Sequence, residues 1–160
     1  MRYATLLPVL LLIYGGVAAQ RPGPLQSEDP VGWLAKTIDG WHRAAAVADS
    51  AAFFGTMLPG AVYIGTDKTE RWTREEMAEW AAPIFRRDTA WAFTAYDRQV
   101  EVDPAAPGMA YWDELLHTWM GVSRGSGVAR RDAEGRWRIA HYHLSVTLDN
   151  DKMDGFLELT

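Results

Sequence analysis

The chain has 160 residues, of which 48% are hydrophobic and 23% are charged, a composition typical of one ordinary globular domain. Its formal net charge of -5 argues against a nucleic-acid partner, because such partners are held mainly by Lys and Arg at the phosphates. The sequence contains no cysteine, so disulfides, iron–sulfur clusters and thiolate chemistry are excluded.

Residues 1–19 have the pattern of a secretory signal peptide. Arg2 precedes an apolar run from Tyr3 to Tyr14, and small residues follow up to Ala19. Residues 20–29 then form a linker. The alternative is an uncleaved membrane anchor, although the apolar run is shorter than the roughly 20 residues that span a bilayer. We therefore expect an exported protein, periplasmic or secreted, with no stable membrane insertion after cleavage.

Three helices are predicted in the first half of the remaining chain. Asp29 and Pro30 form a good helix start. Apolar residues then recur at helical spacing: Leu34, Ile38, Trp41, Ala45 and Ala48. A second, short helix is expected over 51–57, ended by the residues 58–60. A third begins at a capping box formed by Thr73 and Glu76, and Pro83 kinks or ends it.

Strands dominate the second half of the sequence. After a short strand over 61–64, the pattern predicts strands over 91–102, 109–120, 127–131 and 136–148. Turns are expected over 103–108 and 132–135, and the second turn closes a hairpin. Helices followed by long antiparallel strands predict an α+β domain, with the N-terminal helices packed on one face of a curved antiparallel sheet.

The last predicted strand carries two histidines, His141 and His143, on one face. That face begins apolar with Trp137 and turns polar, while the opposite face does the reverse. Either a bulge swaps the two faces or the inner face opens into a cavity lined by the histidines, and we favour the cavity. The imidazoles would then donate and accept protons there. The alternative is a structural role for both, through hydrogen bonds to backbone or a neighbouring carboxylate.

Two adjacent acids, Asp113 and Glu114, point to opposite faces of their strand, so at most one faces a given cavity. Apolar neighbours would raise the pKa of the inward acid and suit it to acid–base work. The alternative is an ion pair across the sheet with Arg130, Arg131 or Arg138. A metal site would need one of these acids or His117 beside the two histidines, and no ligand spacing supports it.

Residues 65–72 have too few glycines, in the wrong order, for a phosphate-binding loop. Trp72 either plugs the junction between strand and helix or lines the mouth of a cavity together with Tyr63. The structural role is the one that we favour.

Three stretches together resemble the SnoaL-like branch of the nuclear transport factor 2-like superfamily. They are Ile64–Asp67 with Glu70–Trp72, Ala110–Glu114, and Gly125–Val128 with Trp137–Ser145. The resemblance runs from about Val31 to Asn150, which gives a domain over 30–150 and a C-terminal tail over 151–160. It implies a cone in which three helices lie over a strongly bent antiparallel sheet, enclosing an apolar pocket, commonly as a homodimer. Members include ketosteroid isomerases, polyketide cyclases and an epoxide hydrolase, alongside pocket-bearing proteins without an established activity.

We therefore expect an exported protein that binds a small, largely apolar molecule, with acid–base activity of the isomerase or cyclase type that needs no cofactor and no metal. The expected catalytic residues are Asp113, Glu114, His141 and His143. The expected ligand-binding residues are Trp41, Tyr63, Trp72, Trp137 and Ser145. The alternative is a non-catalytic ligand-binding protein or a structural dimer.

Overall fold

The computed structural model describes residues 29–159. The expected signal peptide over 1–19 and nearly all of the expected linker lie outside the described residues. The helices are α1 (Pro30–Ala46), α2 (Ser50–Thr56), α3 (Arg74–Ala81), the 3-10 helix η1 (Asn150–Lys152) and α4 (Met153–Leu157). The strands are β1 (Met57–Ile64), β2 (Arg71–Thr73), β3 (Thr94–Val102), β4 (Met109–Thr118), β5 (Gly121–Arg131) and β6 (Trp137–Val146).

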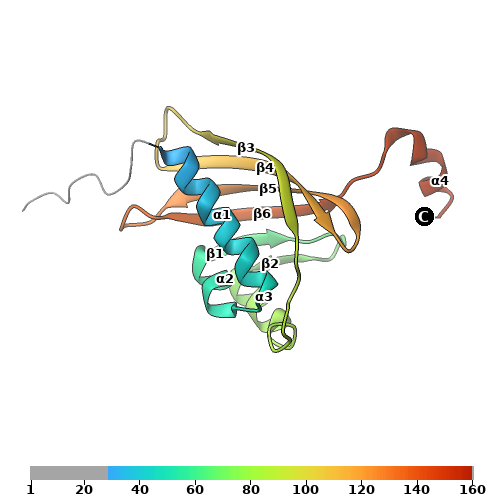
Figure 1. Ribbon diagram of the computed structural model, residues 1–160, viewed down its shortest axis with the longest axis horizontal. Helices are drawn as coiled ribbons and strands as arrows, with labels where there is room; N and C mark the ends of the chain where they lie inside the picture. Colours follow the sequence, from blue (N-terminus) through green and yellow to red (C-terminus); the bar gives the residue numbers. More distant parts are fainter. Residues whose placement is uncertain (1–28, 160) are drawn as a thin grey trace, which may run out of the picture.

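The strands form a single curved sheet in the order β2-β1-β6-β5-β4-β3. Helix α1 crosses one face of this sheet, α2 and α3 lie beside β1 and β2, and α4 stands away from the body (Figure 1). The α+β architecture is as expected. The sheet is mixed rather than purely antiparallel, because β1 and β6 pair in parallel. They are neighbours separated by four strands in sequence, so no hairpin fixes their relative direction.

Local capping signals in the sequence start the helices where expected. The Asp29 carboxylate accepts a hydrogen bond from Gly32 N at 2.8 Å, and Pro30 is the first residue of α1. Thr73 and Glu76 form the capping box of α3, which ends before Pro83. The capping signals are local in sequence, and the structure confirms each of these predictions.

Two glycine-containing segments differ from the prediction. Residues 58–60 do not end a helix but lie within β1, where Gly60 has φ of +69° and the register with β6 shifts. The expected strand over 109–120 ends at Thr118, and β5 begins at Gly121, whose φ is +96°. Positive φ suits glycine, and at Gly121 it allows the tight turn that returns the chain into the sheet. The residues 121–126, expected between two strands, are therefore paired with β4.

The glycines of the Gly-x-Gly-Val stretch are explained by close packing. A Cβ on Gly127 would collide with the Trp112 ring and lie 2.6 Å from the His141 carbonyl oxygen. A Cβ on Gly125 would lie 2.6 Å from the Tyr142 hydroxyl oxygen. The absence of a side chain at these two positions lets the Trp112 and Tyr142 rings lie flat on β5, where they form part of the core.

Candidate functional site

A bulge in β6 decides which residues of this strand face the interior. The register between β5 and β6 shifts at Val128/Ala129, opposite Ile139 and His141. Before the bulge Trp137 and Ile139 are buried, and after it Tyr142 and Leu144 are. The bulge alternative is confirmed, and the orientation that we favoured for the histidines is wrong, because the extra residue moves them to the opposite face.

His141 is half-buried and His143 is exposed, and both lie away from the packed face. Partial burial, with the nearby charges of His143 and Arg71, lowers the pKa of His141. Ser145, the third residue of this row, is half-buried. Asp113 faces outward as well, and Arg124 Nη1 lies 3.1 Å from its Oδ1. These residues therefore do not converge with Glu114 on one cavity.

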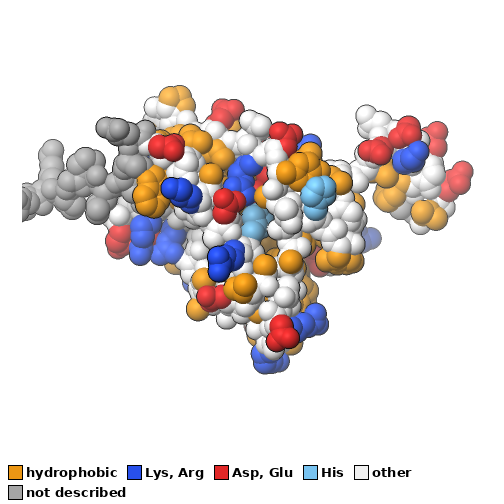
Figure 2. Space-filling model, viewed as in Figure 1, with side chains coloured by type: hydrophobic (Ala, Val, Ile, Leu, Met, Phe, Trp, Pro, Cys, Tyr) orange, Lys and Arg blue, Asp and Glu red, His pale blue; other side chains and the backbone are white. Residues whose placement is uncertain are grey.

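Glu114 is the inward acid, and it is fully buried in an ionic cluster with residues of α1 and β3. His42 Nε2 lies 2.7 Å from Glu114 Oε1, and Arg98 Nε donates a hydrogen bond to Glu114 Oε2 at 2.7 Å. Arg98 Nη1 lies 2.7 Å from Asp39 Oδ1 and donates to the Ala35 carbonyl oxygen. We call His42, Arg98 and Glu114 the buried ionic cluster, and Asp39 lies exposed at its edge. Acidic, basic and histidine side chains lie close together over α1 and β3 in Figure 2.

The expected raised pKa of the inward acid is wrong. Burial by itself raises the pKa of Glu114, but the hydrogen bonds and charges of His42 and Arg98 outweigh it and hold the pKa below its usual range. Burial lowers the pKa of Arg98, and the carboxylates of Glu114 and Asp39 more than offset this and raise it. A carboxylate held ionised in this way stabilises charge in the interior and is poorly suited to giving up a proton near neutral pH.

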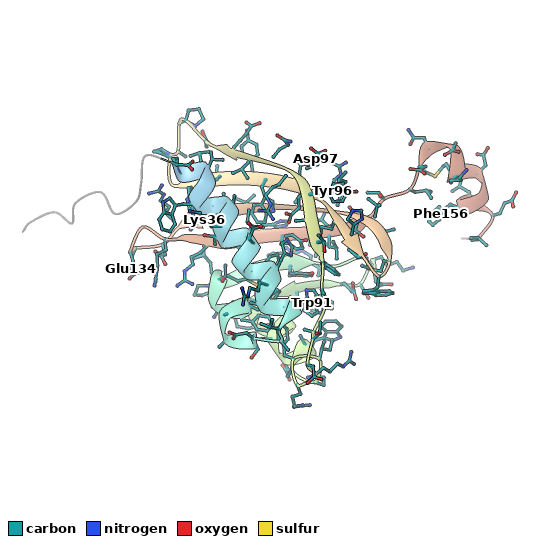
Figure 3. All side chains as sticks on the ribbon, in the orientation of Figure 1. Lys36, Trp91, Tyr96, Asp97, Glu134 and Phe156 are labelled. Atoms are coloured by element: carbon teal, nitrogen blue, oxygen red, sulfur yellow. The ribbon has the colours of Figure 1, made fainter. Side chains whose placement is uncertain are left out.

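A pocket lined largely by aromatic rings opens where the β4–β5 turn approaches α3. Half of the residues that line this aromatic pocket are aromatic: Tyr63, Trp72, Trp80, Trp91, Phe93 and Trp119, with Gly65, Thr66, Glu70, Met77, Met120 and Leu144 completing the wall. Trp91 lies on the segment that leads from α3 to β3 (Figure 3). The cavity has a volume of about 130 Å³.

The rings of the aromatic pocket are arranged in contact with one another. Trp72 and Trp80 stack with centroids 4.8 Å apart, and Trp72 lies 6.3 Å from Tyr63. Trp80 is 47% exposed and Trp119 is 82% exposed, so both present free ring faces or edges to solvent. Burial, with a smaller contribution from Glu70, raises the pKa of Tyr63, so its hydroxyl stays protonated.

The structure separates the four aromatic residues among the expected ligand-binding residues into two groups. Tyr63 and Trp72 line the aromatic pocket, which is the cavity-mouth role that we had ranked below a structural one. Trp41 and Trp137 are instead buried core residues. Trp41 stacks on Phe53 with centroids 4.8 Å apart.

Residues 29–159 contain neither a candidate metal site nor a candidate membrane-spanning helix. No group of three or more His, Asp or Glu side chains in this range is placed to hold a metal ion. No helix in the same range is long and apolar enough to cross a membrane.

The SnoaL-like domain family matches residues 34–149, most of the chain. The chain belongs to the SnoaL-like domain family. This family lies in the NTF2-like superfamily, whose fold is shared by isomerases and dehydratases. No curated protein matches the chain.

Solved structures share the fold of this SnoaL-like domain at low sequence identity. An NTF2-like protein of unknown function from Pseudomonas putida KT2440 is 14% identical, with a TM-score of 0.63, covering 79% of this chain and 92% of its own. A proposed ketosteroid isomerase from Parabacteroides distasonis is 16% identical, with a TM-score of 0.61 and coverage of 78% and 92%. A proposed dehydratase of the NTF2-like family from Streptomyces avermitilis is 17% identical, with a TM-score of 0.60 and coverage of 74% and 96%.

Sequence reasoning missed several residues of this SnoaL-like domain. His42 follows Ile38 by four residues and precedes Ala45 by three, so helical spacing already placed it on the buried face of α1. Trp119 was assigned to a strand, although the glycine two residues later signals a turn. Arg98 and Glu70 carry no local signal, because their partners lie across the sheet or within an irregular loop.

Proposed function

We propose that this SnoaL-like domain binds a small, largely apolar molecule in the aromatic pocket. The observation that carries the proposal is the presence of six aromatic side chains around one cavity, two of them substantially exposed. Aromatic side chains left facing solvent gain free energy when a ligand covers them. Concave, mostly apolar cavities with few polar groups are the usual form of small-molecule sites.

Binding without catalysis accounts for the geometry better than proton transfer does. A site for proton transfer needs an acid and a base within reach of the same ligand atom. Glu114 is paired within the buried ionic cluster and does not line the aromatic pocket, and Asp113 is paired with Arg124 on the outer face. The side chains with polar groups that do line it are few, namely Tyr63, Thr66 and Glu70, which is the pattern of anchors that orient a bound molecule.

Binding is testable with a neutral aromatic alcohol, 4-bromobenzyl alcohol, titrated into the protein while tryptophan fluorescence is recorded. Saturable quenching is expected, because bromine brought close to indole rings quenches their emission. Trp80→Ala is expected to weaken the affinity by about ten-fold, or about 1.4 kcal/mol, through the loss of one stacked ring.

Trp33→Ala is the matched control, because Trp33 is 44% exposed on α1 and does not line the aromatic pocket. Its affinity for the probe is expected to equal that of the wild type. Equal losses in Trp80→Ala and Trp33→Ala, or no saturable quenching, would rule out the aromatic pocket as the binding site.

We also propose that the protein is exported and acts as a homodimer. Export is supported by the basic start, apolar run and small residues of 1–19. Expressed with its own N-terminus in a Gram-negative bacterium, the protein is expected in the periplasm with Gln20 as its first residue, by intact-mass measurement. The released protein is expected to have the mass of a dimer by light scattering. A full-length chain in the cytoplasm would contradict export, and a full-length chain retained in the membrane fraction would contradict cleavage after Ala19.

A further inference from the structure

The aromatic pocket contains a single formal charge, and that charge is negative. Among the described residues that line it, Glu70 is the one acidic residue, and no Lys, Arg or His lines it. Tyr63 and Thr66 add neutral hydroxyl groups. A ligand with a negative charge would be repelled here. A neutral ligand would leave the carboxylate without a partner of opposite charge.

The loop over 65–70 fixes where this carboxylate lies. Gly65 N donates to the Glu70 carbonyl oxygen at 2.9 Å, and Glu70 N donates to the Asp67 carbonyl oxygen at 2.9 Å. Glu70 Oε2 accepts a hydrogen bond from Asp67 N at 3.1 Å, and a Cβ on Gly65 would collide with that oxygen. The side chain is therefore held against the glycine backbone, beside Tyr63 and Trp72 in the pocket wall.

Among residues 29–159, Asp67 N is the one hydrogen-bond donor to the Glu70 carboxylate, and it binds Oε2. One carboxylate oxygen thus fixes the side chain and the other is left for a ligand. Glu70 shares the pocket wall with Trp72 and Trp80, so a cation bound in the pocket would lie near both the carboxylate and the indole rings.

Rings and a carboxylate in this arrangement favour an organic cation. The negative face of an aromatic ring attracts a cation, most strongly for tryptophan, and several rings around one position form the cages that recognise quaternary ammonium groups. Trp72 and Trp80 stack against each other, and Trp91 and Trp119 come from two other segments of the wall. An alkylated ammonium also covers the exposed indoles with methyl groups, which an inorganic cation does not.

The volume of the cavity limits the size of the head group. About 130 Å³ is below the roughly 300–1,000 Å³ that encloses a drug-sized molecule. This space suits a compact ammonium head group better than a larger molecule.

Resting on the proposed function of the aromatic pocket, we infer that its ligand is an organic monocation, with an alkylated ammonium held between the tryptophan rings and the Glu70 carboxylate. Ligand charge is therefore the main determinant of selectivity. The shape of the rings selects compact branched groups, and the carboxylate selects positive ones among them.

Calorimetric titration with choline and with 3,3-dimethyl-1-butanol tests this inference, because the alcohol has the same shape without the charge. Choline is expected to bind at least about ten-fold more tightly than the alcohol. Glu70→Gln is expected to remove this preference, and a circular dichroism spectrum equal to that of the wild type is expected to show that the variant is folded. Glu79→Gln, an exposed carboxylate of α3 outside the pocket wall, is expected to keep the preference.

Equal affinities for choline and the alcohol in the wild type would overturn the monocation inference and leave the aromatic pocket as a site for neutral molecules. Preference for choline that survives in Glu70→Gln would overturn the role of the carboxylate. Absence of binding by choline, the alcohol and 4-bromobenzyl alcohol would overturn both the inference and the proposed function.

Discussion

Glu114→Leu is expected to lower the free energy of unfolding by about 3–5 kcal/mol. The leucine removes the carboxylate that Arg98 and His42 each contact at 2.7 Å, and leaves the guanidinium of Arg98 with the exposed Asp39 as its remaining acidic partner. Breaking a buried pair by removing one partner is costly, because the remaining charge keeps its desolvation penalty and loses its compensation. Urea denaturation at pH 7, followed by circular dichroism, measures the difference.

Two further variants separate lost pairing from lost packing. Asp113→Asn removes the adjacent acid, whose partner Arg124 is half-exposed, and is expected to cost about 0–1 kcal/mol. Glu114→Leu combined with Arg98→Met removes the pair together and is expected to recover part of the loss. If the free energy of unfolding of Glu114→Leu lay within about 1 kcal/mol of the wild-type value, the buried ionic cluster would contribute no more to stability than a surface ion pair does.

The buried ionic cluster also determines the direction in which the free energy of unfolding changes with pH. The pKa of Glu114 is lowered from 4.5 in the folded protein, so its ionised form contributes stability that is fully present above pH 4.5. That contribution is lost as the pH falls through the lowered pKa that Glu114 has in the folded protein. The stability difference between wild type and Glu114→Gln is therefore expected to be constant from pH 7 to about pH 5 and to shrink below pH 4.5.

The parts of the fold that sequence predicts are those fixed by neighbouring residues. The capping box at Thr73 and the Asp29–Pro30 helix start depend on residues three or four apart, so their sequence signals are sufficient. The direction of β1 relative to β6 depends on residues far apart in the chain, and no local signal carries it. The bulge near Ile139 is visible in sequence as a swap of apolar faces, but that pattern also fits a cavity.

In the candidate site, too, the sequence predicts what neighbouring residues decide and not what depends on residues far apart in the chain. Alternation along β4 shows that Asp113 and Glu114 point to opposite faces, but the identity of the inward acid depends on the register of the whole sheet. The partners of Glu114 come from a helix 72 residues away and a strand 16 residues away. The aromatic pocket joins β1, α3 and the β4–β5 turn, so its composition emerges only when these elements are placed together.

Trp41→Ala is expected to lower the free energy of unfolding by about 3–5 kcal/mol, as for other large aromatic side chains in cores. Trp41 is 2% exposed and stacks on Phe53, and it forms a T-shaped pair with Tyr142 with centroids 4.7 Å apart. Alanine would remove both ring contacts and leave a cavity between α1 and the sheet. Thermal and urea denaturation of the variant measure the loss.

Trp33→Ala on the same helix is the control for the loss of a tryptophan as such, and it is expected to cost less than 1 kcal/mol because Trp33 is 44% exposed. Trp41→Phe retains a ring against Phe53 and Tyr142, so it is expected to keep most of the stability and the affinity for 4-bromobenzyl alcohol. If Trp41→Phe stayed stable but lost the probe, Trp41 would be a ligand contact, and the bound molecule would reach past Tyr63 into what is otherwise the packed core.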